Sequence, residues 1–402
     1  MSDFLSVSFE NASTGTARPR GDEWTRGGPD GTIDRQGVDR VPPPRVPSPR
    51  HRRVHRPVPW KEPVSEPRKR ATLRDVAARA GVSVAQASFA LNGRGRVAPA
   101  TAERIRRAAD ELDYQVDRRA RELRTGRRSL YGVVIRNMRN PFFLDVLRGM
   151  EVRAHREGAS LLILSSDYDT AREESVLRRL GTEGVGGVAI TPIGRGGPLS
   201  DWLPRHPDVP VVAFNCTPDP DLSGPGGRVS TVGPDDDAAV SLALEHLRAR
   251  GHRGATLVTA PEGLAADGGR EEEFHRRCAA WGLAGTVVRC PLDHENVARM
   301  TAERLTSTEG HEAFVLNSDH LGIAVYDAAR SLGLRVGSDV SVIGHDDLPT
   351  SALLDPGLTT LRLDRELLGD HIMRLLTGTG TETVRLPVRL MDRGSVALLD
   401  DR

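Results

Sequence analysis

Side chains that can satisfy backbone N–H groups recur at a fixed spacing near residue 72. Thr72 and Asp75 lie three residues apart, and Ser83 and Gln86 repeat that spacing 11 residues later. In such a pair the hydroxyl accepts a hydrogen bond from the N–H of the second residue, and the second side chain accepts one from the N–H of the first. Each pair therefore predicts the first turn of a helix.

The residues between the two pairs predict a tight turn. Val76, Ala77 and Ala80 are apolar and fall on one face of the first predicted helix. Gly81 can adopt the left-handed backbone conformation that ends a helix, and Val82 can pack in the angle between the helices. Two capped helices joined in this way have the shape of a DNA-reading motif.

A third helix is predicted from Pro99, because proline suits the first turn of a helix. Its apolar face consists of Ile105, Ala108, Ala109 and Leu112. In order, the chain contains T-x-x-D-V-A-x-x-A-G-V-S, S-x-x-L-N-G, V-x-x-x-T-x-x-R-I and E-L-x-Y. From Thr72 nearly to its end, the chain closely resembles the lactose-repressor (LacI/GalR) family of bacterial transcription regulators. The resemblance implies an all-α helix-turn-helix headpiece at residues 71–116.

The resemblance also places the second helix in the major groove of DNA. Its leading residues Val84, Ala85 and Gln86 would face base edges, and Gln86 is the one of these that can bond an adenine edge bidentately. Phe89 stands where many members have arginine, so we expect weaker reading of guanine at that base pair. Contacts with phosphates, which position the protein without specifying sequence, are predicted for Thr72, Ser88, Asn92, Arg94 and Arg96.

Residues 117–129 form a short, very basic segment that would be marginal as an isolated helix. The resemblance implies a hinge helix here, formed when a partner and DNA supply the missing burial. Leu123 would then enter the minor groove as an apolar wedge, with Ala120 lining the groove. A charged linker is the alternative interpretation.

The charge of the chain is divided unevenly, although its net value is +1. Residues 71–130 carry 13 arginines against 7 acidic residues, whereas residues 131–402 carry 29 arginines against 39 acidic residues. A small basic domain beside a larger acidic one is typical of a protein that attracts phosphate at one end. The alternative is an ordinary solvated surface.

Residues 1–70 differ in composition from the rest. The segment VPPPRVPSPRHRRVHRPVPWKEPVSEPRKR is rich in proline and arginine, which predicts a disordered extension able to add non-specific phosphate contacts. The alternative is that translation starts later, near Val64.

From Tyr131 onward, apolar runs of strand length alternate with helical stretches. The runs are YGVVI, SLLILSS, GGVAIT, VPVVAF, GATLVT, AGTVVRC, EAFVLNSD and DVSVIGHDD. Helices are predicted over residues 143–157, 170–180, 235–250, 270–281, 296–307 and 321–332. The pattern predicts doubly wound parallel α/β sheets in two lobes, with a ligand at the carboxyl ends of the strands. The resemblance likewise implies a periplasmic-binding-protein-like core at residues 130–402.

By resemblance, the effector pocket is built from several strand ends. Phe142 and Phe143 could stack on a sugar or nucleobase, or could be core aromatics. Arg270 stands where the family uses an arginine to bind ligand hydroxyls or a carboxylate. Asp346 could bind ligand or cap the turn in G-H-D-D. The other predicted effector-binding residues are Asn215, Ser318 and Asp319.

Three departures from the family pattern affect this part of the chain. Glu273 stands in place of a usual glycine, and DHLGIA replaces D-x-x-A-L-G. Both could alter the local helix packing and the ligand. His345 replaces a usual aromatic residue and could make the cleft pH-sensitive or serve as a hydrogen-bonded structural residue.

An enzyme and an exported receptor are the alternatives to a regulator. The chain contains no G-x-S-x-G, H-E-x-x-H or G-x-x-x-x-G-K-[ST] motif, and we predict neither catalysis, a cofactor nor a metal. A receptor would need a signal sequence, which is not evident, and no run of about 18 apolar residues predicts a membrane span. Cys216, Cys278 and Cys290 have no paired spacing, which suits reduced thiols in the cytoplasm.

The mechanism implied by the resemblance is a homodimer that reads a near-palindromic operator on double-stranded DNA. A small-molecule effector, such as a sugar or related metabolite, would move one lobe against the other and so favour or melt the paired hinge helices. Repression is the family's usual role. The last predicted strand is followed by no heptad repeat, so we expect a dimer rather than a tetramer.

Overall fold

The computed structural model describes residues 71–91, 97–114, 128–217, 222, 229–264 and 268–399. Two predictions therefore lie outside the described residues, namely the disordered extension at 1–70 and nearly all of the hinge segment at 117–129. None of the helices described is both long and apolar enough to cross a membrane.

The headpiece consists of three helices, α1 (Leu73–Ala80), α2 (Val84–Leu91) and α3 (Pro99–Glu111). Val76, Ala87 and Ile105 are fully buried at its centre. Gly81 has a φ of 62° and ends α1 as predicted, and Pro99 occupies the first turn of α3. The predicted helix-turn-helix and its third helix are confirmed.

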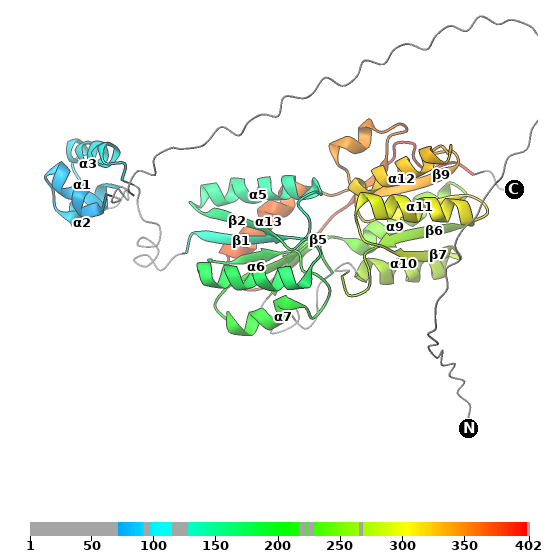
Figure 1. The fold of residues 1–402 in the computed structure, drawn as a ribbon, viewed down its shortest axis with the longest axis horizontal. Helices are drawn as coiled ribbons and strands as arrows, with labels where there is room; N and C mark the ends of the chain where they lie inside the picture. Colours follow the sequence, from blue (N-terminus) through cyan, green and yellow to red (C-terminus); the bar gives the residue numbers. More distant parts are fainter. Residues whose placement is uncertain are drawn as a thin grey trace, which may run out of the picture. The chain divides into compact units, whose positions relative to one another are not determined.

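The first lobe is a six-stranded parallel sheet with the order β11-β5-β4-β3-β1-β2. Its strands are β1 (Leu130–Ile135), β2 (Ser160–Ser165), β3 (Val188–Ile190), β4 (Val211–Phe214), β5 (Val229–Pro234) and β11 (Thr383–Leu386). Its helices are α5 (Phe142–Arg156), α6 (Thr170–Glu183), α7 (Pro198–Trp202), η1 (Leu203–Arg205) and α13 (Arg365–Thr377). Helices α5 and α13 pack on one face of the sheet, and α6 and α7 on the other (Figure 1).

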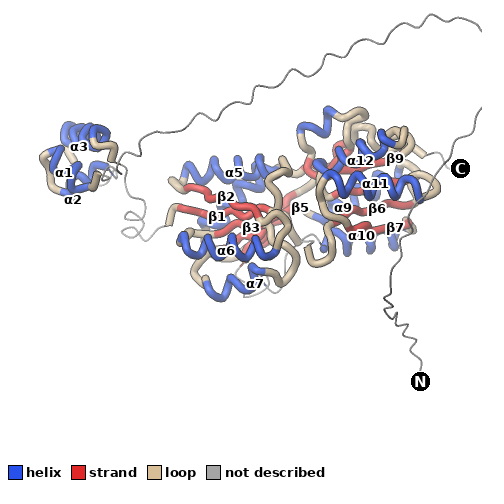
Figure 2. The backbone as a smooth tube through the Cα atoms, viewed as in Figure 1, coloured by secondary structure: helices blue, strands red, loops and turns tan. Residues whose placement is uncertain are grey.

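The second lobe repeats this plan with the order β12-β10-β9-β8-β6-β7, in which only β12 is antiparallel to its neighbour. Its strands are β6 (Gly254–Thr259), β7 (Ala284–Arg289), β8 (Glu312–Leu316), β9 (Val340–Asp346), β10 (Thr359–Arg362) and β12 (Arg389–Met391). Its helices are α9 (Asp236–Ala249), α10 (Gly268–Trp281), α11 (His294–Ser307), α12 (Asp319–Ser331) and η2 (Pro349–Leu353). Helices flank both faces of each sheet (Figure 2).

The chain passes between the lobes three times, at β5 to α9, β10 to α13 and β11 to β12. Helix α13 returns to the first lobe and lies against α5. Gly149 and Gly369 allow this contact, because a Cβ on either would lie 2.1 Å from a backbone oxygen of the other helix. The lobes are thus joined by three short segments rather than by one linker.

The departures from the family pattern do not disturb the helices that carry them. Helix α12 is regular, and a Cβ at Gly322 would lie 2.9 Å from the Leu358 side chain, so glycine fits there. Glu273 is fully buried in α10, where its carboxylate pairs with Arg276 and Arg277. Both helices thus form, and an effect of these departures on the ligand stays a prediction.

Candidate functional site

The start of each helix in the reading motif is held by its own side chains. The Thr72 N–H donates to Asp75 Oδ2 at 2.8 Å, and the Asp75 N–H donates to Thr72 Oγ1 at 3.4 Å. In α2 the Gln86 N–H donates to Ser83 Oγ at 3.2 Å, and the Ser83 N–H donates to Gln86 Oε1 at 3.3 Å. Both predicted capping boxes are present.

The leading face of α2 is open to solvent. Ala85 and Gln86 are exposed, and the exposed fractions of Val84 and Phe89 are 43% and 49%. Apolar side chains on a short helix cost free energy when exposed, and contact with DNA or another surface would cover them. The structure presents the residues for which base contacts are predicted.

Two of the predicted phosphate contacts differ in exposure. Ser88 is only 8% exposed, whereas Thr72 is exposed. Contact of either hydroxyl with a phosphate stays a prediction. The other predicted contacts, Asn92, Arg94, Arg96, Ala120 and Leu123, lie outside the described residues.

A narrow cleft lies where the carboxyl ends of strands from both lobes meet, and its cavity volume is about 40 Å³. Arg136 and Asn137 follow β1, Asn215 follows β4, and Asn317 follows β8. The lining residues are Arg136, Asn137, Asn140, Phe143, Tyr168, Asn215, Ala260, Leu264, Arg270, Leu292, Asn317, Ser318, His320 and Leu321. Side chains with both donors and acceptors beside apolar ones suit a small polar ligand.

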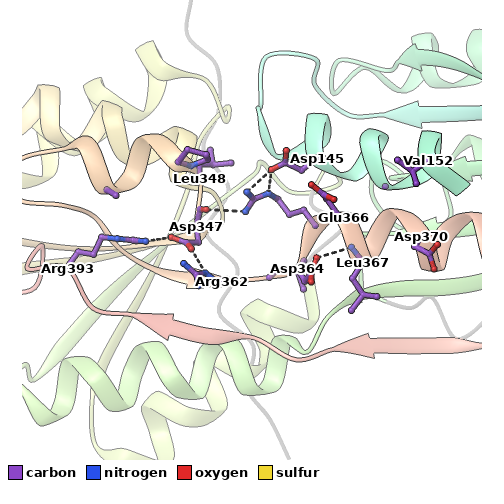
Figure 3. A pocket seen from close by; sticks show the side chains of 15 residues that line it. Asp145, Val152, Asp347, Leu348, Arg362, Asp364, Glu366, Leu367, Asp370 and Arg393 are labelled. Atoms are coloured by element: carbon purple, nitrogen blue, oxygen red, sulfur yellow. Dashed lines mark hydrogen bonds and ion pairs between the residues drawn. The ribbon is translucent and has the colours of Figure 1, made fainter.

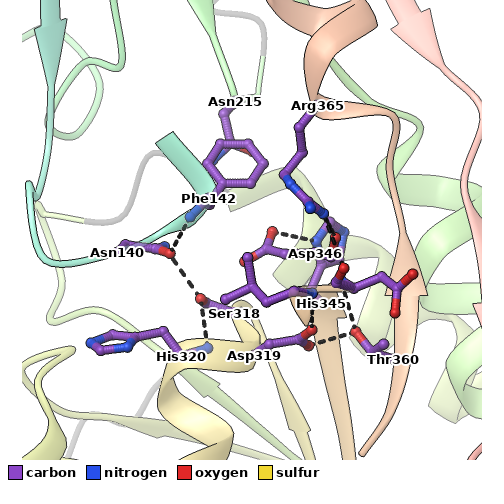
Figure 4. Close-up of polar contacts among 12 residues, drawn as sticks. Asn140, Phe142, Asn215, Ser318, Asp319, His320, His345, Asp346, Thr360 and Arg365 are labelled. Atoms are coloured by element: carbon purple, nitrogen blue, oxygen red, sulfur yellow. Dashed lines mark hydrogen bonds and ion pairs between the residues drawn. The ribbon is translucent and has the colours of Figure 1, made fainter. Parts of the chain in front are cut away.

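Four of the predicted effector-binding residues line this cleft, namely Phe143, Asn215, Arg270 and Ser318. The Asn140 side-chain amide donates to Ser318 Oγ at 3.2 Å and so joins the two lobes across it (Figure 4). Arg270 is held in place by Asp236, whose Oδ1 accepts from its Nε at 3.0 Å and from its Nη2 at 2.8 Å.

Phe142 and Asp319 are buried in the protein rather than lining the cleft, which corrects their predicted placement. Asp346 is buried beside the lining residues Ser318 and Arg270, and its contact with a ligand stays a prediction. Phe142 is 1% exposed and packs edge-on against Phe143 in the core, as the alternative interpretation had it. The Asp319 carboxylate accepts from the Leu348 N–H at 2.8 Å, from Ser351 Oγ at 2.6 Å and from Thr360 Oγ1. It therefore holds the turn that follows β9.

Asp346 lies at the end of β9, buried beside Asp319. Burial raises the pKa of both carboxyls, and the charge of Asp346 raises the pKa of Asp319 further. The pair therefore carries fewer than two negative charges near neutral pH. His345 is 2% exposed and its Nδ1 lies 3.2 Å from Asp346 Oδ1, which supports the structural role considered for this histidine.

Sequence reasoning missed most of the polar lining. Arg136, Asn137, Tyr168, Asn317 and His320 were not predicted as ligand contacts. Most of them directly follow parallel strands, and that position is a signal that could have identified them.

A set of ion pairs connects the lobes on another side of the strand ends. Arg365, at the start of α13, donates to Asp145 Oδ2 on α5 at 2.9 and 2.7 Å, and also to the backbone oxygens of Asp346 and Asp347. Asp347 lies between Arg362 and Arg393 and pairs with both (Figure 3). The turn after β9 is thus tied to a helix of the first lobe.

Comparison with known proteins places both parts of the chain. Residues 72–117 match the model for bacterial regulatory proteins of the lacI family, and residues 244–396 match a periplasmic binding protein-like domain. The HTH-type transcriptional regulator PtxS of Pseudomonas aeruginosa is 30% identical over 82% of this chain and 96% of its own. This chain belongs to the lacI family. Another member, the HTH-type transcriptional regulator CelR of Thermobifida fusca, is 30% identical over 80% of this chain and 96% of its own.

Solved structures of the lacI family show the same fold. The lac repressor dimer bound to operator and the anti-inducer ONPF has a TM-score of 0.69 and 24% identity, covering 82% of this chain and all of its own. The complex of CelR with cellobiose has a TM-score of 0.57 and 26% identity, covering 81% of this chain and all of its own. The lacI-family regulator thus has an α-helical headpiece and a two-lobed α/β core.

Proposed function

We propose that this regulator binds a near-palindromic operator as a homodimer. A small molecule in the interlobe cleft would raise or lower its affinity for the operator. In this proposal residues 71–116 read DNA, residues 117–129 form the hinge and residues 130–402 bind effector and partner. The main observation that supports it is the pair of capped helices α1 and α2, with the leading side chains of α2 exposed.

The relatives support the proposal of effector binding as well as that of operator binding. The lac repressor structure holds operator DNA, and the CelR structure holds cellobiose. A cleft lined by asparagines, arginines and a phenylalanine ring offers hydrogen bonds and stacking to a sugar or related metabolite. We therefore assign a regulatory role in the cytoplasm, as a repressor and without catalysis.

Binding-site selection from a random pool of duplex DNA tests the first half of this proposal. The full-length chain should enrich a near-palindrome whose half-sites are set by the two-fold symmetry of a dimer. Recovery of unrelated sequences after repeated rounds would contradict it.

A thermal-shift screen of sugars, nucleosides and their phosphates tests the second half. A ligand at 100 times its Kd should stabilise the core by about 2.7 kcal/mol, and it should also change the affinity for the selected operator. Turnover of a bound sugar would instead support an enzyme.

A further inference from the structure

Arg136 is a buried cation at the floor of the interlobe cleft. It directly follows β1, at the carboxyl end of the central part of the first-lobe sheet, and it lines the cleft beside Asn215. Only 8% of its surface is exposed. A guanidinium at this depth has lost most of its water, so its charge must be balanced by protein groups or by a ligand.

The protein groups around Arg136 balance its positive charge poorly. Its Nη2 donates to the backbone oxygen of Asn215 at 2.8 Å. Its Nε is buried and finds no acceptor among the described residues, and none of the described carboxylates forms an ion pair with it. A hydrogen bond to one neutral carbonyl leaves most of the capacity of the five N–H donors unused.

One carboxyl that interacts with the charge of Arg136 is that of Glu173, which lies fully buried on α6. Its Oε2 accepts from the Ile193 N–H at 3.0 Å, and its Oε1 is buried with no hydrogen-bond partner in the part of the chain described. Burial raises the pKa of Glu173 to about 7, although the charge of Arg136 opposes this rise. Glu173 is therefore a partial counterion at neutral pH.

The rest of the cleft does not supply the missing negative charge. Arg270, on the facing lobe, already takes the carboxylate of Asp236. Burial raises the pKa of Asp346, and it lowers the pKa of the lining residue His320 so that this imidazole is neutral. Arg136 and Arg270 thus both line the cleft, and the described lining residues include no carboxylate.

We propose that Arg136 selects an effector that carries a carboxylate or phosphate group on a polyhydroxylated body. The anion would take the unused guanidinium donors, while the amides of Asn140, Asn215 and Asn317 bind hydroxyls. This inference rests on the proposed function, since it assumes that the cleft holds the effector. It adds the class of ligand, an anionic sugar derivative rather than a neutral sugar.

Isothermal titration of the full-length chain with matched probes tests this proposal. The probes are glucose, gluconate and glucose 6-phosphate, and ribose, ribonate and ribose 5-phosphate. At least one anionic probe should bind at least tenfold more tightly than its neutral parent. The gluconate and ribonate arms report a carboxylate site, and the phosphate arms report a phosphate site.

The variant Arg136→Gln should lose this preference, so that the anion and its neutral parent bind within threefold of each other. Arg139→Gln is the matched control, because Arg139 is exposed and does not line the cleft. Since the cation is poorly compensated, Arg136→Gln should keep or raise the Tm, which shows that the variant is folded.

Three outcomes would overturn the proposal: binding of a neutral sugar as tightly as its anions, failure of every anionic probe to bind, or an anion preference that survives Arg136→Gln. A neutral sugar that alters operator affinity would leave the proposed function intact while excluding an anionic effector. Failure of the DNA selection would instead overturn the proposed function.

Discussion

Gln86 caps α2, and we propose that it also contacts a base edge of DNA. Its side-chain oxygen closes the capping box with Ser83, and its exposed amide is the one group on the leading face of α2 that suits an adenine edge. The hydrogen bonds to Ser83 are long, at 3.3 and 3.4 Å, so the amide can turn toward DNA at small cost.

Replacing Gln86 should separate the cap from the base contact. Gln86→Ala should lose both the bond from the Ser83 N–H and the base contact, and a lost bidentate contact costs about 1–3 kcal/mol of discrimination. Gln86→Glu keeps an acceptor for the Ser83 N–H but removes the amide donor, so it should keep the Tm and still lose the adenine preference. Anisotropy titrations on the selected operator and on single-base variants would measure both. Unchanged base preference in Gln86→Glu would exclude this residue from readout.

Glu173 should make the stability of the core depend on pH. Burial raises its pKa in the native state from 4.5 to about 7, so the native state holds a proton that the unfolded chain releases. The contribution to the free energy of unfolding is complete below pH 4.5 and is lost as pH rises through about 7.

Glu173→Gln should therefore flatten this part of the pH profile. It should raise the free energy of unfolding by about 1–3 kcal/mol at pH 8 and change it little at pH 4.5. Urea denaturation at several pH values measures the effect. Exposed Glu174 on the same helix is the control position, since Glu174→Gln should leave the profile unchanged. If Glu173→Gln lowered the free energy of unfolding relative to wild type at pH 8 but not at pH 4.5, the raised pKa of Glu173 would be refuted.

At the scale of elements, most strands could be predicted but their assembly could not. The eight apolar runs all form strands, and the six predicted helices all form near their expected bounds. Strands β5, β10, β11 and β12 were not predicted, because they are short or contain polar residues. The return of α13 to the first lobe depends on its close contact with α5 through Gly149 and Gly369, and periodicity does not encode long-range contacts.

In the candidate site, too, local features could be predicted and long-range contacts could not. The caps and turn of the headpiece follow from local rules, so they were predicted residue by residue. Asp319 follows a strand as expected, but its carboxylate holds the turn after β9 and does not line the cleft. Which side of a strand end a side chain takes depends on neighbours such as Ser351 and Thr360, which are distant in sequence.

Arg365 connects the two lobes, and we expect this connection to affect how effector binding changes operator affinity. It ties α5 of the first lobe to the turn after β9 of the second, beside Asp346. Arg365→Met should change by about 0.5–2 kcal/mol the effect that the effector has on operator affinity, because coupling between sites travels through such contacts. Asp145→Asn should change this effect in the same direction. The changes caused by Asp145→Asn and Arg365→Met should not add up in the double variant, because the two side chains contact each other.

The control for this prediction is Arg148→Met, because Arg148 pairs with Glu366 at 3.3 Å between the same two helices but both side chains are more than half exposed. Operator titrations with and without the effector found by thermal shift supply the coupling energies. Equal coupling in Arg365→Met, Arg148→Met and wild type would show that Arg365 is only structural.

At the scale of the whole molecule, the proposal requires operator and effector to influence each other equally. If an effector weakens operator binding by some factor, the operator must weaken effector binding by the same factor. We expect a factor of about 5–150, measured by titrating effector into the chain with and without saturating operator. If the Kd for effector were the same with and without operator, the headpiece and the core would not be coupled.

Sequence-specific recognition is the claim on which all of this depends. The most direct measurement is the Kd of the full-length chain for the selected operator and for a duplex of the same length and composition with scrambled half-sites, both at 150 mM salt. The operator should bind at least about 10³-fold more tightly than the scrambled duplex, as specific sites do. Gln86→Glu should reduce this ratio of the two Kd values. Affinities within threefold of each other for the two duplexes would contradict the assignment of α2 as a reading helix.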